Sequence, residues 1–112
     1  MKASAISTSQ VKAKLFRGMS DPSRLSILEA LRDGAKNVSQ IVEISGLSQP
    51  NTSMHLTCLW ECGLVDRERR GRFTYYRIKS TRLADVLQLT DLLLDDVSCR
   101  VAECARYRDP IE

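Results

Sequence analysis

Two helix-start signals in close succession constrain the fold of this chain more than any other feature. In NVSQIVEISG, Asn37 and Gln40 have the spacing of a capping box, and Gly46 is a typical residue just after a helix end. A second helix signal begins at once, with Ser48 as a natural N-cap. Because only Gly46 and Leu47 separate the two segments, the sequence predicts two short helices packed as a helix-turn-helix.

The rest of the chain carries similar helix-start and helix-end signals. The second helix of the pair has Pro50 in its first turn, where a missing N–H is tolerated, and Gly63 at its end. Helix signals also cover residues 8–19, 21–34 and 80–97, with Asp21 and Ser80 as N-caps. LVDRERRGRFTYYRIK alternates around a charged, glycine-bearing turn, which predicts a two-stranded hairpin. The predicted fold class is therefore mainly α with a small β-hairpin (α+β).

The length of 112 residues predicts one domain, residues 1–112, with a core at about 8–97 and a cysteine-bearing tail at 98–112. No apolar run reaches the roughly 18 residues of a membrane-spanning helix, and MKASAISTSQ lacks the apolar stretch of a signal peptide. We therefore expect a cytoplasmic protein without a membrane partner. The last predicted helix has apolar residues on more than one face, which predicts a second face buried against a partner chain.

The second helix of the pair has the composition of a recognition helix. Such a helix presents short polar side chains to base edges in the major groove and packs its opposite face on the core. Its apolar anchors are expected to be Met54, Leu56, Leu59 and Trp60. The hairpin segment RERRGR gathers four arginines, which suit phosphates or a minor groove. The predicted DNA-binding residues are Ser48, Gln49, Asn51, Thr52, Ser53 and His55 on the helix and Arg69, Arg70 and Arg72 on the hairpin.

Cys58 and Cys62 lie four residues apart near the end of this helix, and Cys99 and Cys104 follow in the tail. Residues four apart on a helix hold their Cβ atoms about 5 to 6 Å apart, whereas a disulfide needs about 3.5 to 4.5 Å. A metal ion, with metal–sulfur bonds of about 2.3 Å, can join two thiolates without straining the helix. A helical tail would offer one of Cys99 and Cys104, which would point about 140° apart, and an irregular tail would offer both.

Three segments together resemble the winged helix-turn-helix of the ArsR/SmtB family of metal-responsive repressors. They are DPSRLSILEALRDG, VSQIVEISGLSQPNTSMHLTCLWECGLV and RRGRFTYYRI, and the resemblance covers about residues 10–97. It implies a homodimer that binds double-stranded operator DNA, with the first and last helices at the dimer interface. It also implies that metal binding weakens the hold on the operator.

The position of the cysteines is similar to that in the cadmium and lead sensors of the CmtR type. The resemblance of HLTCLWECGLV implies that Cys58 and Cys62 bind the metal together with a cysteine from the C-terminal region of the other subunit. Here the tail offers Cys99, Cys104 or both as the remaining ligands, and His55 shares the helix stripe of the pair. Sulfur ligands favour soft ions, so Cd(II) or Pb(II) is the expected inducer, with Hg(II), As(III) and Zn(II) as alternatives.

Two other interpretations stay open. In the first, the same regulator senses redox state, because cysteines can oxidise to a sulfenate or to an intersubunit disulfide. In the second, the chain is a small thiol or metal enzyme of the arsenate-reductase kind. Against an enzyme stand the absence of a Cys-x-x-Cys motif and of a phosphate-cradling loop, and a lone histidine, His55, within the recognition helix. We therefore expect that the protein is not an enzyme.

Overall fold

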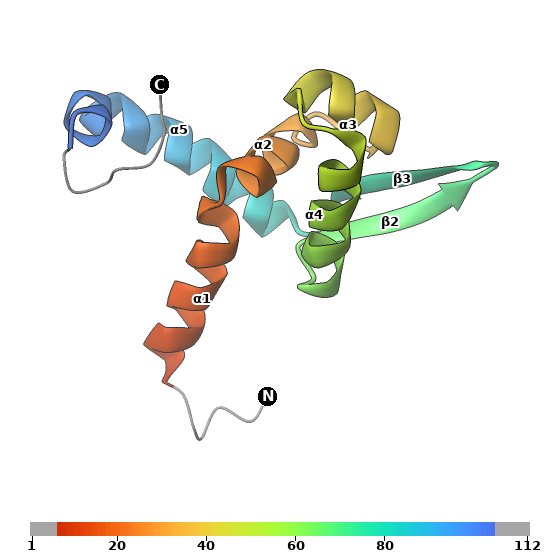
Figure 1. Cartoon of the computed structure of the whole chain (residues 1–112). Coiled ribbons are helices and arrows are strands. Elements are labelled where there is room, and N and C mark those ends of the chain that lie inside the picture. The colour runs from red at the N-terminus through yellow and green to blue at the C-terminus, as the bar shows by residue number, and fades with distance from the viewer. Residues whose placement is uncertain (1–6, 105–112) are drawn as a thin grey trace. The chain divides into compact units, whose positions relative to one another are not determined.

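The computed structural model describes residues 7–104, apart from the side chains of Ser98 and Cys99. The chain divides into two compact units, one ending at Ser80 and the other beginning at Thr81, and each is described by itself. The first unit contains the helix-turn-helix and the hairpin, as Figure 1 shows. Its elements are α1 (Thr8–Ser20), α2 (Pro22–Ala30), β1 (Lys36–Asn37), α3 (Val38–Ser45), α4 (Gln49–Glu61), β2 (Val65–Arg70) and β3 (Phe73–Ile78). The second unit contains α5 (Thr81–Ala102).

The helix starts confirm the capping signals of the sequence. The Asp21 carboxylate accepts a hydrogen bond from the Arg24 amide at 3.0 Å and so caps α2. Asn37 and Gln40 form a reciprocal capping box at the start of α3. These caps satisfy amides that have no partner within the helix, so they fix where each helix begins. The predicted end of the 21–34 segment is late, because α2 ends at Ala30.

The turn between α3 and α4 is as short as predicted. Gly46 caps α3 with a φ of 77°, in the left-handed region that glycine adopts without steric cost. The Ser48 hydroxyl then accepts a hydrogen bond from the Asn51 amide at 3.2 Å and starts α4. The two helices pack on each other and on α2, which makes a helix-turn-helix. Its fully buried side chains are Ile27, Leu28, Ile41, Thr52, Leu56, Leu59 and Val65.

The hairpin belongs to a three-stranded antiparallel sheet with the order β1-β3-β2. The register pairs Val65 with Ile78 and Arg70 with Phe73, and Asn37 of β1 lies opposite Tyr75 of β3. Strand β1 was not predicted, because two residues are too short to show an alternating pattern. Asn37 is thus both the last residue of β1 and the cap of α3, so the hairpin is attached directly to the helix-turn-helix.

Helix α5 is longer than predicted. It continues to Ala102, five residues past the expected end of the core, and therefore contains Cys99. Cys104 follows the helix, and its amide donates to the Val101 carbonyl at 3.2 Å. Residues 105–112 of the predicted tail lie outside the described residues. The exposed apolar side chains of α5 are Val86, Leu89, Leu92, Leu93, Leu94 and Val101.

None of the helices found in residues 7–104 has both the length and the apolar character needed to cross a membrane. The observed class is mainly α with a small antiparallel sheet, as predicted.

Candidate nucleic-acid interface and thiol pair

Helix α4 has a buried core face, an opposite face and two flanks. Thr52, Leu56 and Leu59 are at most 1% exposed and share one face, as expected for residues three and four apart. At about 100° per residue, the position two residues from both Thr52 and Leu56 lies nearly opposite this core face. The opposite face and the two flanks between them carry every other residue of the helix. The function of each α4 residue can therefore be judged from its angle around the axis.

Thr52 corrects the predicted DNA-binding set. Its side chain is fully buried, and its hydroxyl donates to the Ser48 carbonyl at 2.8 Å. Because this hydrogen bond is made within the helix, the buried hydroxyl is not left without a partner. A polar residue can therefore lie on the apolar face. Thr52 is thus a packing residue and cannot reach a base edge.

The other predicted polar residues of α4 stand apart from the core. Gln49, Asn51 and Ser53 are exposed, and His55 is half-buried on a flank. Ser48 is exposed too, but its hydroxyl already accepts the Asn51 amide, so its first role is to cap the helix. The N-terminal half of α4 therefore offers three free polar side chains to solvent.

Two of the predicted apolar anchors are in fact on the surface. Met54 is 59% exposed and Trp60 is 39% exposed, whereas Leu56 and Leu59 are buried as expected. Met54 is two residues from both Thr52 and Leu56 and so lies nearly opposite the core. Trp60 lies on the flank next to β2, where the Arg67 guanidinium covers its ring. The sequence missed that these two apolar residues face outward.

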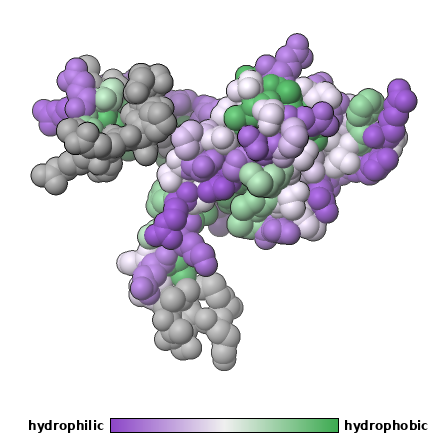
Figure 2. Space-filling view, viewed as in Figure 1, coloured by the Kyte–Doolittle hydropathy of each residue, from purple (hydrophilic) through white to green (hydrophobic). Residues whose placement is uncertain are grey.

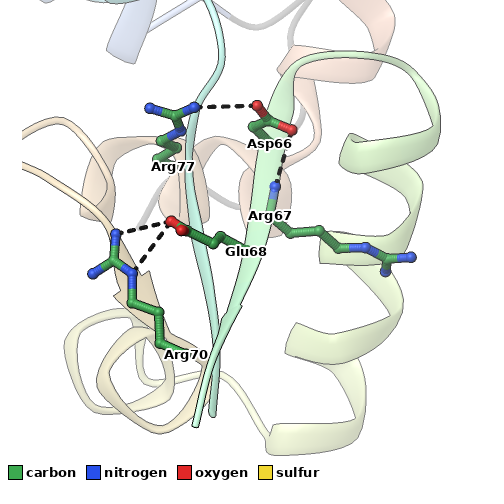
Figure 3. A network of polar contacts seen from close by, with 5 residues as sticks. All are labelled: Asp66, Arg67, Glu68, Arg70 and Arg77. Atoms are coloured by element: carbon green, nitrogen blue, oxygen red, sulfur yellow. Dashed lines mark hydrogen bonds and ion pairs between the residues drawn. The ribbon is translucent and has the colours of Figure 1, made fainter.

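The predicted arginines of the hairpin lie on two faces of the sheet. Side chains alternate along a strand, so Arg67 and Arg69 share one face of β2 and Arg70 lies on the other. Figure 3 shows Arg67 extending toward α4, while Arg70 is held by Glu68, with 3.2 Å between the guanidinium and the carboxylate. Arg69 is exposed and its Nε donates to the Gly71 carbonyl.

A surface hollow of about 310 Å³ brings together predicted residues from separate elements. Gln49 enters it from the start of α4, and Arg72 enters it from the hairpin turn. Its remaining lining residues are Asn37, Val38, Ser39, Phe73, Thr74 and Tyr76. Figure 2 shows hydrophilic side chains along the outer end of the hairpin, as expected for a surface that meets phosphates.

The two helix cysteines form a pair of neighbouring thiols. Cys58 is half-buried, and Cys62 is the exposed C-cap of α4. The Cys62 amide donates to the Cys58 carbonyl at 3.0 Å, which sets the two residues one turn apart. Burial raises the pKa of the Cys62 thiol, and the adjacent Cys58 raises it further through its charge and a hydrogen bond between the two side chains. The two thiols are thus neighbours on one helical turn.

The thiol pair lies on the flank of α4 away from the hairpin. Cys58 and Cys62 each stand two residues from Trp60, which places them about 200° around the axis from the side chain that meets β2. The Arg24 guanidinium of α2 acts in the opposite direction on the Cys62 thiol and lowers its pKa. One flank of the helix therefore contacts the hairpin and the other carries the sulfur atoms.

The other two cysteines belong to the second unit. Cys99 lies within α5, and Cys104, just after it, is half-buried. Among the side chains that the structure describes, no three of His, Cys, Asp or Glu come together as a metal site within one chain. Cys58 and Cys62 of α4 are therefore the neighbouring thiols that the described part of one chain offers.

Known proteins similar to this chain are transcriptional regulators. The family model described as "Bacterial regulatory protein, arsR family" matches residues 21–67. A probable mercury resistance operon repressor of Streptomyces lividans is 36% identical over 84% of this chain and 75% of its own length. The HTH-type transcriptional regulator CmtR of Mycobacterium bovis is 38% identical over 89% of this chain and 87% of its own length.

A solved structure of the same fold is a homodimeric winged helix-turn-helix DNA-binding domain from Mycobacterium bovis, described as a possible ArsR-family transcriptional regulator. It is 26% identical, with a TM-score of 0.69, and the match covers 83% of this chain and 91% of that one. In this chain the β2–β3 hairpin follows the helix-turn-helix and is the wing of that fold.

Proposed function

Because this chain belongs to the ArsR family of metal-responsive winged helix-turn-helix repressors, we propose that it represses transcription until a thiophilic metal ion binds its cysteines. Proteins of this kind are DNA-binding regulators, and the chain is not an enzyme. The ion is Cd(II) or Pb(II), and binding releases operator DNA. One observation carries the proposal: two neighbouring thiols lie on the same helix that offers Gln49, Asn51 and Ser53 to the major groove.

The DNA-binding surface consists of the N-terminal half of α4 and the wing. Gln49, Asn51 and Ser53 contact base edges, for which amide and hydroxyl side chains are suited. Arg69 and Arg72 contact phosphates, while Arg70 contributes only after its pairing with Glu68 is exchanged for a phosphate. His55 stands on a flank of α4 beside this surface. The hollow that Gln49 and Arg72 share supports contact with one stretch of DNA by both elements.

The metal ligands are Cys58 and Cys62, completed by Cys99, Cys104 or both. Two thiolates one turn apart suit a soft ion and do not suit Mg(II) or Ca(II). Because the pKa of Cys62 is raised, only an ion that displaces the thiol proton binds well near neutral pH. Cys99 and Cys104 are separated by the end of α5, so the constraint of one continuous helix does not apply to them.

The five ions that the thiolates could bind fall into three ranks. Cd(II) and Pb(II) are favoured by the cysteine pattern of the recognition helix. Hg(II) is the second candidate, because the similar protein from Streptomyces lividans is named for mercury resistance. As(III) and Zn(II) are weaker alternatives that the same thiolates could bind.

Metal binding acts on the helix that touches DNA. An ion held by Cys58 and Cys62 at the C-terminal end of α4 is tied to a further cysteine outside that helix, so it shifts the position of α4. A shift of the helix displaces the base-reading side chains at its other end. Allosteric coupling of about 1 to 3 kcal/mol would weaken DNA binding about 5- to 150-fold.

The working form is a homodimer in the cytoplasm. Helix α5 exposes a set of leucines, and α1 exposes Leu15 and Phe16, at 45% and 60% respectively. Exposed apolar faces of this extent support burial against a second copy of the chain. The similar domain from Mycobacterium bovis is homodimeric, which supports the same assembly here.

The test is a titration of reduced, metal-free protein with Cd(II), followed by the ultraviolet band of sulfur-to-metal charge transfer. The wild type should give a saturable band that collapses in Cys58→Ser and in Cys62→Ser. Cys99→Ser and Cys104→Ser identify the remaining ligand, and Mg(II), which prefers oxygen ligands, is the control. Operator affinity measured in the same samples should fall on saturation with Cd(II).

A wild type without the band, or helix variants that bind Cd(II) as well as the wild type does, would contradict metal sensing. If peroxide then removed free thiols and DNA binding together, the protein would be a redox sensor instead.

A further inference from the structure

We propose that Met54 reads thymine in the operator, by apolar contact with the thymine methyl group in the major groove. The inference rests on the proposed operator binding and adds the chemistry of one base contact. The observation behind it is the exposure of Met54, which its apolar character did not predict. An apolar side chain in the middle of the helix–turn–helix is 59% exposed, although the chain buries other apolar residues of the same helix completely.

The angle of Met54 around α4 points it away from the protein. Thr52 and Leu56, the two fully buried neighbours, are each two positions away, so the Met54 side chain lies about 160° from the core. It is the sixth residue of the helix and stands next to Ser53, in the half of a recognition helix that reaches bases.

The residues above and below Met54 offer few hydrogen bonds. Pro50, four positions earlier, is exposed and has no polar side-chain atom. Thr57, three positions later, is exposed, but its hydroxyl donates to the Ser53 carbonyl at 3.0 Å. Pro50, Met54 and Thr57 therefore form a strip along the outward face of α4 that meets DNA chiefly through carbon.

Thymine is the base that such a strip recognises. The major groove displays one apolar group, the C5 methyl of thymine, and every other feature there is a hydrogen-bond donor or acceptor. A methionine, with three rotatable bonds and a polarizable sulfur, can adjust to a methyl group whose position is fixed by the duplex. Gln49, Asn51 and Ser53 then supply the hydrogen bonds to neighbouring bases.

The experiment first selects binding sites from a random duplex library with the metal-free, full-length wild type. Each thymine of the selected site is then replaced by deoxyuridine, which removes only the methyl group. At one thymine per half-site the wild-type affinity should fall about 4-fold, as expected for one methyl group lost from an apolar contact. In Met54→Ala the same replacement should have no effect, and Met54→Gln should select adenine at that position.

Ile44→Ala is the matched control, because Ile44 is 57% exposed and apolar but lies on α3. It should keep the sensitivity to deoxyuridine. If no thymine methyl matters to the wild type, or if Met54→Ala is as sensitive as the wild type, the role of Met54 is overturned while operator binding stands. If the wild type selects no sequence, operator binding and the role of Met54 are both overturned.

Discussion

The guanidinium carbon of Arg67 lies 3.7 Å from the centroid of the Trp60 ring, so a cation–π contact joins the wing to the last turns of the recognition helix. Arg67 comes from β2 and Trp60 from α4. Such contacts contribute about 0.5 to 1 kcal/mol at exposed sites. Trp60 is the one tryptophan of the chain, so all tryptophan fluorescence comes from this ring.

Arg67→Ala should shift the emission of Trp60 to longer wavelength, because the ring loses its cover and meets water. It should also lower the free energy of unfolding by about 0.5 to 1 kcal/mol. Arg77→Ala is the control, since Arg77 pairs with Asp66 at 3.3 Å. Emission spectra and urea unfolding would check both effects. An unchanged emission maximum in Arg67→Ala would mean that the stack is not formed in solution.

Thr52→Ser should lower the free energy of unfolding by about 1 kcal/mol, because it removes one buried methyl group and keeps the hydroxyl. Thr57→Ser makes the same change at an exposed position with the same kind of helix hydrogen bond, and should change stability by less than about 0.5 kcal/mol. Chemical denaturation of the two variants gives the comparison. Equal losses would contradict the assignment of Thr52 to the core.

Gly46→Ala should destabilise the protein by about 1 to 2 kcal/mol, since Gly46 holds a φ of 77° that an L-residue adopts at a cost. Gly18→Ala, within α1, should instead stabilise it by about 0.5 to 1 kcal/mol through helix propensity. An added Cβ meets nothing within 4 Å at either position, so backbone conformation alone separates the two variants. Melting temperatures that move in the same direction would refute this explanation.

The raised pKa of Cys62 predicts slow alkylation of this thiol in the reduced, metal-free protein. The thiolate is the nucleophile, so a raised pKa leaves less of it at a given pH and moves the midpoint of the rate profile to higher pH. Cys58→Ala removes the neighbouring thiol and should move the midpoint back toward the ordinary cysteine value. Rates with iodoacetamide, followed by mass spectrometry from pH 7 to 11, would check this. A Cys62 midpoint below that of free cysteine would contradict it.

Much of the fold could be predicted because its boundaries are set locally. Asp21, Asn37 and Ser48 each bond an amide three residues ahead, so the sequence alone reveals where α2, α3 and α4 begin. Strand β1 could not be predicted in this way, because two residues become a strand only when β3 lies beside them. The extent of α5 was missed because Val101 is the single large apolar residue between Val97 and the helix end, which is too little to show an apolar stripe.

The candidate site was predicted less completely for a related reason. A sequence shows which residues of α4 are apolar, but the direction of the core selects among them. Met54 and Trp60 were assigned to the core by composition and lie on the surface, while Thr52 was assigned to DNA and lies inside. The four-residue spacing of Cys58 and Cys62 needed no such information, because one helical turn brings them together whichever way the helix faces.

Strand β1 has a consequence for how the proposed repressor would dissociate from DNA. Because Asn37 ends β1 and also caps α3, the sheet that contains the wing continues into the helix pair with no loop between β1 and α3. The wing and the helix pair would therefore move as one body. A small rotation would then break the hydrogen bonds to bases and the contacts with the DNA backbone in one step. Release would then be all-or-none, and the inducer would change how long the repressor stays on its site more than how many contacts it keeps.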